Sequence, residues 1–256
     1  MSDKGTIIVT GGAAGIGFAI CEQLLAQDWT IIAADINENA IEAARQAFET
    51  KFGEKAKQIR FERLNVADEN NMVQQVALWA ASASPLRGLV NSAGIGADIP
   101  ALETGVEKFR QILDINLIGS FVMSREVAKV MQKTGGGSIV NIASVSGITG
   151  NLGRTAYGAS KGAVIQMSRI LAVEFAPFKI RVNSVSPGPI ETAMAKMMHT
   201  DEARKSWTDR VLLHRYAEPY EVAGAVTFLL DEEKSSYITG QNLAVDGGFT
   251  IGGIID

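Results

Sequence analysis

The chain has 256 residues, a length at which α/β folds often form one domain. Hydrophobic residues make up 46% and charged residues 20%, which is typical of a globular protein with a sizeable core. The formal net charge of -4, without a cluster of lysines and arginines, argues against nucleic-acid binding. No apolar run approaches the ~18 residues of a membrane span, so no membrane partner is expected.

Cys21 is the only cysteine, and His199 and His214 are the only histidines. An internal disulfide is therefore impossible, a Cys/His zinc site is not expected, and we predict no metal site. The first residues, Met1-Ser2-Asp3-Lys4, lead directly into a predicted strand and lack the charged-then-apolar pattern of a signal peptide. A single unpaired cysteine also suits a reducing compartment, so we expect a cytoplasmic protein.

Short β-branched runs alternate with longer amphipathic stretches along the chain. Strands are predicted at 6–10, 30–35, 58–64, 88–91, 138–144, 181–186 and 243–245. Helices are predicted near 16–27, 38–52, 69–81, 104–133, 155–176 and 219–231. This alternation indicates βαβ units and a parallel sheet, and right-handed crossovers place helices on both faces. The expected fold is α/β, a doubly wound (Rossmann) sheet in a single domain over residues 1–256.

The region 190–216 has the weakest pattern, with three methionines, both histidines and mixed charge. A long irregular stretch inside a compact domain is often a lid over a binding site. We therefore predict a substrate lid at about 190–216.

A glycine-rich turn follows the first predicted strand. Gly11, Gly15 and Gly17 have the spacing Gly-x-x-x-Gly-x-Gly, and Ile16 lies between the last two. Glycines there let the backbone approach a phosphate, and the following helix presents free N–H groups and a positive dipole end. The spacing differs from the commoner Gly-x-Gly-x-x-Gly fingerprint, and a tight strand–helix turn without a ligand is the alternative.

Asp35 ends the second predicted strand, 20 residues after Gly15. A carboxylate at this place accepts hydrogen bonds from the adenosine ribose and repels a 2′-phosphate. Ile36 follows, and no basic residue stands in the turn, which favours NAD over NADP as the cofactor. The alternative is that Asp35 caps the next helix, whose start is also marked by Asn37 and Asn39.

Two further strand ends fit the same crevice. Asn65-Val66 follows the third strand and is placed to border the adenine. Asn91-Ser92-Ala93-Gly94 follows the fourth strand and supplies small residues where the backbone passes near the cofactor. Either segment is also compatible with an ordinary turn, because Asn and Gly are common in loops.

Tyr157 and Lys161 lie four positions apart on a predicted helix, so their side chains share one face. A nearby ammonium favours the phenolate, and we expect Lys161 together with a cationic cofactor ring to lower the pKa of Tyr157 so that it works as a base. Ser144 ends a preceding strand and is placed to donate a hydrogen bond. Taken alone, Tyr-x-x-x-Lys is a common pair, and Ser144 is also compatible with a turn-capping role.

With these features together, the chain resembles the short-chain dehydrogenase/reductase family from end to end. The matching segments are residues 10–17, 91–94, Asn116, Ser144, Tyr157 with Lys161, Pro187-Gly188 and Thr192. Two departures are Asn65, where relatives usually carry aspartate, and Ser92, which replaces a second asparagine.

The resemblance implies a role for each matching residue. Tyr157 is expected to be the general acid/base, Ser144 the donor that orients the substrate oxygen, and Lys161 the residue that holds the nicotinamide ribose. Asn116 is expected to shape its helix and support a proton-relay water, although a packing amide is the alternative. The remaining expected cofactor contacts are Val66 and Asn91 at the adenosine part and Pro187, Gly188, Ile190 and Thr192 at the nicotinamide end.

The substrate rim is the least determined part of the site. Asn151, Arg154 and Thr155 precede Tyr157 and make the rim polar. Arg154 is a candidate to bind an anionic group, with a solvated surface charge as the alternative. His199 is a candidate lid residue, with an exposed histidine as the more ordinary interpretation.

The leading functional hypothesis is NAD-dependent interconversion of a secondary alcohol (a sugar, polyol or hydroxy acid) and its ketone. The first alternative is a 3-oxoacyl-thioester reductase, because the segment 150–153 is similar to that branch. The second alternative is a non-catalytic NAD-binding scaffold, which the intact Ser144, Tyr157 and Lys161 set disfavours.

The family resemblance also implies a homotetramer. Apolar residues on the helix 104–133 exceed what one buried face needs, namely Leu113, Ile115, Leu117, Phe121 and Val122. The segment 246–249 is expected at a second interface. The alternative is that these apolar residues lie under neighbouring helices of the same chain.

Overall fold

A computed structural model describes residues 4–81 and 84–252; Met1, Ser2 and Asp3 of the amino-terminal run lie outside the described residues. One sheet with the strand order β3-β2-β1-β4-β5-β6-β7 runs through the molecule, and every pairing in it is parallel. The strands are β1 (Thr6–Thr10), β2 (Thr30–Asp35), β3 (Ile59–Arg63), β4 (Leu86–Asn91), β5 (Gly137–Ile142), β6 (Ile180–Pro187) and β7 (Asn242–Val245). This confirms the predicted doubly wound α/β fold.

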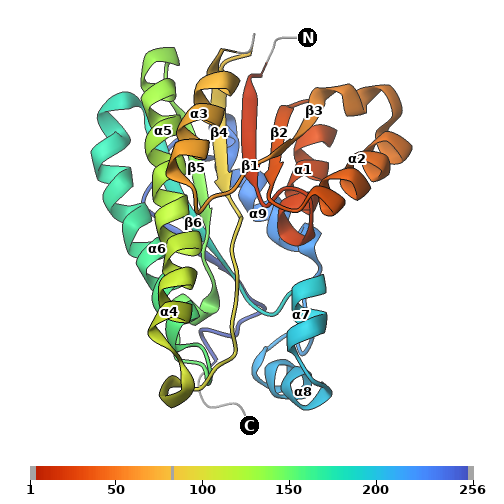
Figure 1. The fold of residues 1–256 in the computed structure, drawn as a ribbon, viewed down its shortest axis with the longest axis vertical. Helices are drawn as coiled ribbons and strands as arrows, with labels where there is room; N and C mark the ends of the chain where they lie inside the picture. Colours follow the sequence, from red (N-terminus) through yellow and green to blue (C-terminus); the bar gives the residue numbers. More distant parts are fainter. Residues whose placement is uncertain (1–3, 82–83, 253–256) are drawn as a thin grey trace.

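Helices cover both faces of the sheet (Figure 1). On one face α1 (Gly15–Ala26), α2 (Glu38–Phe52) and α9 (Pro219–Leu230) pack against Ile7 and Val9. On the other face α3 (Glu69–Ala80), α5 (Gly119–Thr134) and α6 (Thr155–Phe175) pack against Ile8. Successive side chains of a strand point to opposite faces, so a continuously apolar strand such as β1 belongs in the centre of the sheet.

The predicted helix 104–133 is interrupted in the structure. It consists of α4 (Val106–Leu113), a π-helical turn η3 (Asp114–Ile118) and α5. Asn116 lies in the π-helical turn, where its side chain bonds the backbone of Ile95 on a neighbouring loop. Hydrophobic periodicity cannot reveal one extra residue in a turn, so the interruption was not predicted.

The predicted lid contains two helices that the sequence pattern did not reveal. These are α7 (Ala193–Met198) and α8 (Asp201–Arg210), and Figure 1 shows them beyond the carboxyl ends of the strands. Threonine side chains cap both, Thr192 before α7 and Thr200 before α8. Helix α8 buries none of its residues, which explains why no apolar stripe marked it. The remaining short elements are η1 (Gly53–Gln58), η2 (Ala101–Glu103), η4 (Val145–Gly147), η5 (Ala176–Phe178) and α10 (Glu232–Ser235).

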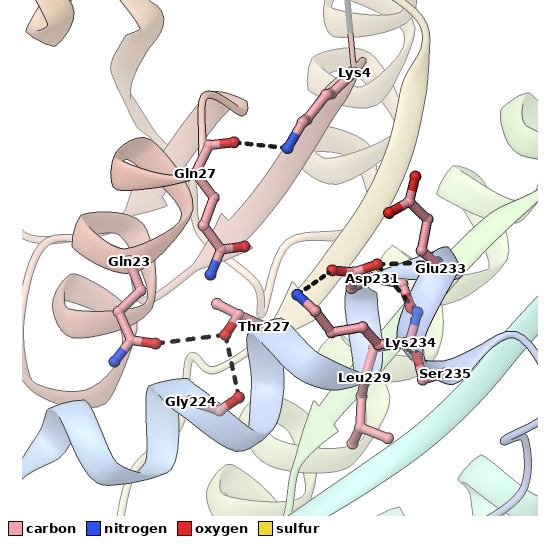
Figure 2. Close-up of polar contacts among 10 residues, drawn as sticks. All are labelled: Lys4, Gln23, Gln27, Gly224, Thr227, Leu229, Asp231, Glu233, Lys234 and Ser235. Carbon is pink, nitrogen blue, oxygen red and sulfur yellow. Dashed lines mark hydrogen bonds and ion pairs between the residues drawn. The ribbon is translucent and has the colours of Figure 1, made fainter.

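Polar contacts fix the packing of α1 and α9 at the end of the sheet opposite the lid (Figure 2). Thr227 Oγ1 donates a hydrogen bond to Gln23 Oε1 at 3.4 Å. Asp231 caps α10 by accepting hydrogen bonds from Glu233 N and Lys234 N. These contacts close the edge of the core formed by Leu229 and its neighbours. Among the described residues, no helix combines the length and the apolar content that crossing a membrane requires.

The apolar residues named for the predicted subunit interface differ in their exposure. Of the five apolar residues expected to mediate association, Val122 is buried within the chain and Phe121 is exposed, while Leu113, Ile115 and Leu117 are intermediate. Phe249, expected at a second interface, is buried against Trp207 of the same chain. Other exposed apolar residues on α4 to α6 are Val106, Ile118, Ile170 and Val173.

Candidate active site

A cavity of about 410 Å³ opens at the carboxyl ends of β1, β2, β4, β5 and β6. Ligands of open parallel α/β sheets bind at this edge, because the strand order reverses there and leaves a crevice. The sites predicted from separate parts of the sequence meet in this cavity. It therefore defines the candidate active site.

The glycine turn forms one end of the cavity. Gly11 and Gly15 have φ angles of +65° and +53°, a conformation that favours glycine. Gly15 would meet only Thr192 within 4 Å if it carried a Cβ, so the turn leaves open space above it. Ala14 at the N-cap of α1 has no side-chain acceptor, and the first turn of the helix carries no acidic residue. The N–H groups of this helix end therefore remain available for an anion.

Gly17 has a different function, because it allows the turn to close on itself. A Cβ on Gly17 would lie 2.1 Å from the carbonyl oxygen of Gly11. Replacing Gly17 by alanine is expected to destabilise the fold by more than ~2 kcal/mol and to weaken dinucleotide binding. Urea unfolding and a fluorescence titration with NADH would measure both effects. Gly150→Ala is the matched control, because a Cβ there meets nothing within 4 Å.

Asp35 lines the cavity next to the glycine turn. Its carboxylate accepts hydrogen bonds from Ala13 N at 3.3 Å and Asn37 N at 3.0 Å. The N-cap of α2 is Asn37, whose side chain accepts from Ala40 N, so the alternative role of Asp35 as the helix cap is not what the structure has. Sequence reasoning missed Arg63, which pairs with Asp35 in the sheet register. The guanidinium of Arg63 is bound to Glu38 at 3.1 Å.

The other predicted residues of the adenosine part divide into two groups. Asn65, Val66, Ala93 and Gly94 line the cavity. Asn91 is not among the described residues of the cavity wall. It is buried beneath it, where Nδ2 donates to Ser120 O, Ser124 Oγ and Asn141 Oδ1. Asn91 therefore joins β4 to α5 and β5, and direct cofactor contact by its side chain is not what the structure shows. Among the described residues, none forms a hydrogen bond with Asn91 Oδ1.

The cavity wall also holds the predicted nicotinamide contacts. The cavity is lined by Gly11, Ile16 and Gly17 from the turn and also by Pro187, Gly188, Ile190 and Thr192. Gly188 passes close to Asp246, since a Cβ on it would lie 2.8 Å from the Cα of that residue. The loop after β6 thus reaches the site only because this position has no side chain.

Ser144, Tyr157 and Lys161 all line the inner part of the cavity. Ser144 follows β5 and hydrogen-bonds the phenol of Tyr157. Lys161 is buried one helical turn beyond Tyr157, and its Nζ donates to Ile142 O at 2.8 Å. The structure therefore brings together the three residues that the sequence placed on two separate elements.

The main influence on the pKa of Tyr157 in the structure is burial rather than Lys161. Burial raises the pKa of Tyr157 above its usual value, and the bond from Ser144 and the charge of Arg154 only partly offset this. Burial also lowers the pKa of Lys161 to about 8. Lys161 Nζ lies 5.8 Å from the centroid of the Tyr157 ring rather than beside its hydroxyl. Burial is the largest influence on both pKa values, and it disfavours the charged form of each group.

The buried ammonium of Lys161 costs stability. A pKa of 10.5 in the unfolded chain and about 8 in the fold corresponds to about 3 kcal/mol at pH values below 8. This free-energy cost decreases as pH rises from 8 to 10.5. Over that range Lys161 has already lost its proton in the folded chain, and by 10.5 the unfolded chain loses it as well. We expect Lys161→Met to abolish turnover yet raise the free energy of unfolding at pH 7 by about 1–2 kcal/mol, since the bond to Ile142 O is lost as well.

Urea unfolding at pH 7 and pH 10 measures this effect, and the gain should shrink at the higher pH. Lys57→Met, at an exposed position, is the control and should leave stability nearly unchanged. A Lys161→Met protein that is less stable than the parent at pH 7 would contradict the argument.

Asn116 is buried behind the three residues and does not line the cavity among the described residues. Its Nδ2 donates to Ile95 O and Ser160 Oγ, both at 3.0 Å, and its Oδ1 accepts from Ile95 N at 2.9 Å. Ser160 Oγ in turn donates to Tyr157 O. Asn116 therefore ties the loop after β4 to the helix of Tyr157.

The residues predicted at the substrate rim do not all line the same cavity. Asn151 lines a second hollow, which shares Ser146 and Arg154 with the main cavity, and it bonds Thr149 O. Arg154 lines the main cavity, but Asp98 already binds its guanidinium. His199 is half-buried in the cavity wall and is not an exposed histidine. Sequence reasoning missed Asp98 and Trp207, because each stands in a segment without a motif.

Comparisons with known proteins agree with this arrangement. A family model described as "Enoyl-(Acyl carrier protein) reductase" matches residues 11–250. Cyclopentanol dehydrogenase of Comamonas sp. is 38% identical over 98% of both chains. A 3-oxoacyl-(acyl-carrier-protein) reductase of Thermotoga maritima is 37% identical over 95% of this chain and 97% of its own. Galactitol 2-dehydrogenase (L-tagatose-forming) of Cereibacter sphaeroides is 37% identical over 97% of this chain and 96% of its own.

Solved structures share the fold at lower sequence identity. A short-chain type dehydrogenase/reductase from Mycobacterium ulcerans has a TM-score of 0.91 at 30% identity, covering 97% of this chain and 90% of its own. ElxO, solved with NADP bound, has a TM-score of 0.88 at 30% identity, covering 96% and 98%. Fold, site geometry and relatives together show that the chain belongs to the short-chain dehydrogenase/reductase family.

Proposed function

We propose that this protein is an NAD-dependent oxidoreductase that interconverts a secondary alcohol and its ketone. The observation that carries the proposal is the meeting of Ser144, Tyr157 and Lys161 in the same cavity as the glycine turn and Asp35. One end of that cavity suits a dinucleotide, and the other end suits proton transfer to a substrate oxygen. The dehydrogenases of cyclopentanol and galactitol among the relatives support this reaction class.

The cavity fits a nicotinamide dinucleotide. The uncapped end of α1 and the open space above Gly15 suit the pyrophosphate, and Asp35 suits the adenosine ribose. Pro187, Gly188, Ile190 and Thr192 would hold the nicotinamide end, with Asn65, Val66, Ala93 and Gly94 along the adenosine part. When bound, the cofactor supplies the hydride chemistry of the reaction.

The chain's own residues handle the substrate oxygen and its proton. Tyr157 takes the proton of the alcohol during oxidation and returns it during reduction. Ser144 orients the same oxygen by a hydrogen bond and stabilises its negative charge. Lys161 holds the ribose side of the site, and Asn116 positions the helix of Tyr157 through Ile95 and Ser160.

NAD is proposed over NADP because Asp35 places a carboxylate where a 2′-phosphate would lie. Arg63, the basic residue beside it in the sheet, is engaged by Glu38 and does not line the cavity among the described residues. ElxO was solved with NADP bound, so the assay of this chain compares both cofactors.

A second candidate is reduction of a 3-oxoacyl thioester. The 37% identity to a 3-oxoacyl-(acyl-carrier-protein) reductase favours it specifically. Against it stands the segment 132–135, which carries little basic surface for an acidic carrier protein.

One experiment separates the two candidates. Purified protein is assayed with NAD and NADP in parallel, on cyclic alcohols and polyols for oxidation and on acetoacetyl thioesters for reduction. The proposal expects turnover of alcohols with NAD at a kcat/KM well above that for the thioesters. Faster reduction of thioesters with NADPH would support the second candidate instead.

We also propose that the chain forms one catalytic domain, with α7 and α8 as its substrate lid, and that it works as a cytoplasmic homotetramer. Exposed apolar residues on α4 to α6, such as Val106, Ile118 and Val173, support association through these helices. Light scattering during size exclusion would test the tetramer against the 27.3 kDa monomer.

A further inference from the structure

Arg154 stands at the substrate end of the cavity, next to the proposed catalytic tyrosine. It precedes α6 as its N-cap residue, and its guanidinium carbon lies 5.4 Å from the centroid of the Tyr157 ring. Its side chain is only 11% exposed. An unpaired guanidinium at this place would attract an anionic substrate group to within reach of Tyr157.

Asp98 forms an ion pair with the guanidinium of Arg154 and offsets its positive charge. Arg154 Nε bonds Asp98 Oδ1 at 2.5 Å and Arg154 Nη2 bonds Asp98 Oδ2 at 3.1 Å, which is a two-pronged carboxylate–guanidinium contact. Asp98 is not among the described residues that line the cavity. The loop that carries Asp98 is fixed beside Arg154 by a backbone bond of 2.9 Å from Ile99 N to Gly153 O. The pair is therefore built into the wall of the site.

The histidine on the other side of Arg154 adds no charge. Arg154 Nη2 lies 3.1 Å from His199 Nε2, and an arginine can only donate, so Nε2 must carry the lone pair. The proton then belongs to Nδ1, which lies 2.9 Å from the hydroxyl of Tyr216. Burial and the Arg154 charge both lower the pKa of His199, which agrees with a neutral ring.

The remaining wall of this end is mostly apolar. Ile95, Val145, Ala195 and the indole of Trp207 line it, and Trp207 is held in place by Phe249 with 5.0 Å between the ring centroids. Among the described residues, none accepts a hydrogen bond from Arg154 Nη1, so this group remains available to a substrate oxygen. The substrate end thus combines an apolar wall, a guanidinium paired with a carboxylate and a free N–H donor.

We propose that Asp98 determines specificity by neutralising Arg154, so that the enzyme takes uncharged alcohols and ketones and disfavours carboxylates. Arg154 Nη1 then bonds a second, uncharged oxygen of the substrate. This inference rests on the proposed alcohol–ketone reaction and narrows its substrate class by removing hydroxy acids.

The test compares two molecules of nearly the same shape that differ in charge, 4-oxocyclohexanecarboxamide and 4-oxocyclohexanecarboxylate. The parent enzyme is expected to reduce the amide with the higher kcat/KM. In Asp98→Asn the ratio should shift toward the carboxylate by about 10-fold to 100-fold, because the Arg154 charge is released. Asp98→Glu keeps the charge and should not shift the ratio, and Arg154→Gln added to Asp98→Asn should abolish the gain.

A binding measurement keeps this inference separate from the proposed reaction. Cyclohexanecarboxamide and cyclohexanecarboxylate, which have no carbonyl to reduce, are titrated into the NADH-loaded protein by calorimetry. A shift of their Kd ratio in Asp98→Asn supports the inference even if neither ketone is reduced. A parent protein that prefers the carboxylate, or a ratio unchanged by Asp98→Asn, overturns it.

Discussion

Tyr157→Phe is expected to lower kcat by about 10²-fold to 10⁴-fold while leaving the Kd for NADH within about twofold. Phenylalanine keeps the ring that packs between Arg154 and Lys161 but has no proton to exchange. Because burial raises the pKa of the phenol, the parent enzyme should oxidise alcohols faster as pH rises from 7 toward 10. Reduction needs the protonated phenol and should be retained at neutral pH. Steady-state rates in both directions across this pH range measure the effect.

Tyr220→Phe is the matched control for this substitution. Tyr220 is exposed on α9 and does not line the cavity among the described residues, so its hydroxyl should not affect kcat. Ser144→Ala should give a loss of about 10²-fold, because a single donor to the substrate oxygen is removed. Turnover by Tyr157→Phe at the parental rate would refute the assignment of the general acid/base.

The second large effect concerns the choice of cofactor. Asp35→Asn combined with Ile36→Arg is expected to change the ratio of kcat/KM for NAD to that for NADP by about 10²-fold or more in favour of NADP. Asparagine removes the carboxylate charge that repels a 2′-phosphate but keeps an acceptor for Ala13 N. Ile36 is exposed and lines the cavity, so an arginine there meets the phosphate without disturbing the core.

Glu42→Gln provides the control for the loss of one carboxylate charge. Glu42 lies on α2 and does not line the cavity among the described residues. Parallel kinetics with both cofactors on one alcohol measure the ratio. A parent enzyme that already prefers NADP would show that Asp35 does not select the cofactor, and attention would turn to Arg63.

Several parts of the candidate site could be predicted from sequence because their signals are local. The spacing of Gly11, Gly15 and Gly17 follows from turn geometry, and the spacing of Tyr157 and Lys161 follows from the helical repeat. The end of a predicted strand also indicates where a residue lies, because the carboxyl ends of parallel strands meet at one edge of the sheet. This is why Ser144, Asp35 and Val66 were assigned to the same crevice as the glycine turn.

Other parts depended on contacts between segments far apart in the chain. No sequence pattern indicates that Asp98 faces Arg154 or that His199 lies between Arg154 and Tyr216. The same limit applies to the pKa of Tyr157, because the dominant influence on it is burial. Burial belongs to the packed molecule, and a spacing of four residues gives no measure of it.

The sequence by itself determined the fold class, the order of the elements and the identity of the residues around the glycine turn and Tyr157. The alternating hydrophobic periodicities and the short-range spacing of motif residues carry that information, and both can be read from the sequence. The tertiary structure alone decided the interruption at Asn116, the buried place of Asn91 and the pairing of Arg154 with Asp98. Each depends on side chains from different elements meeting in the interior, where removal from water and pairing decide which charges persist.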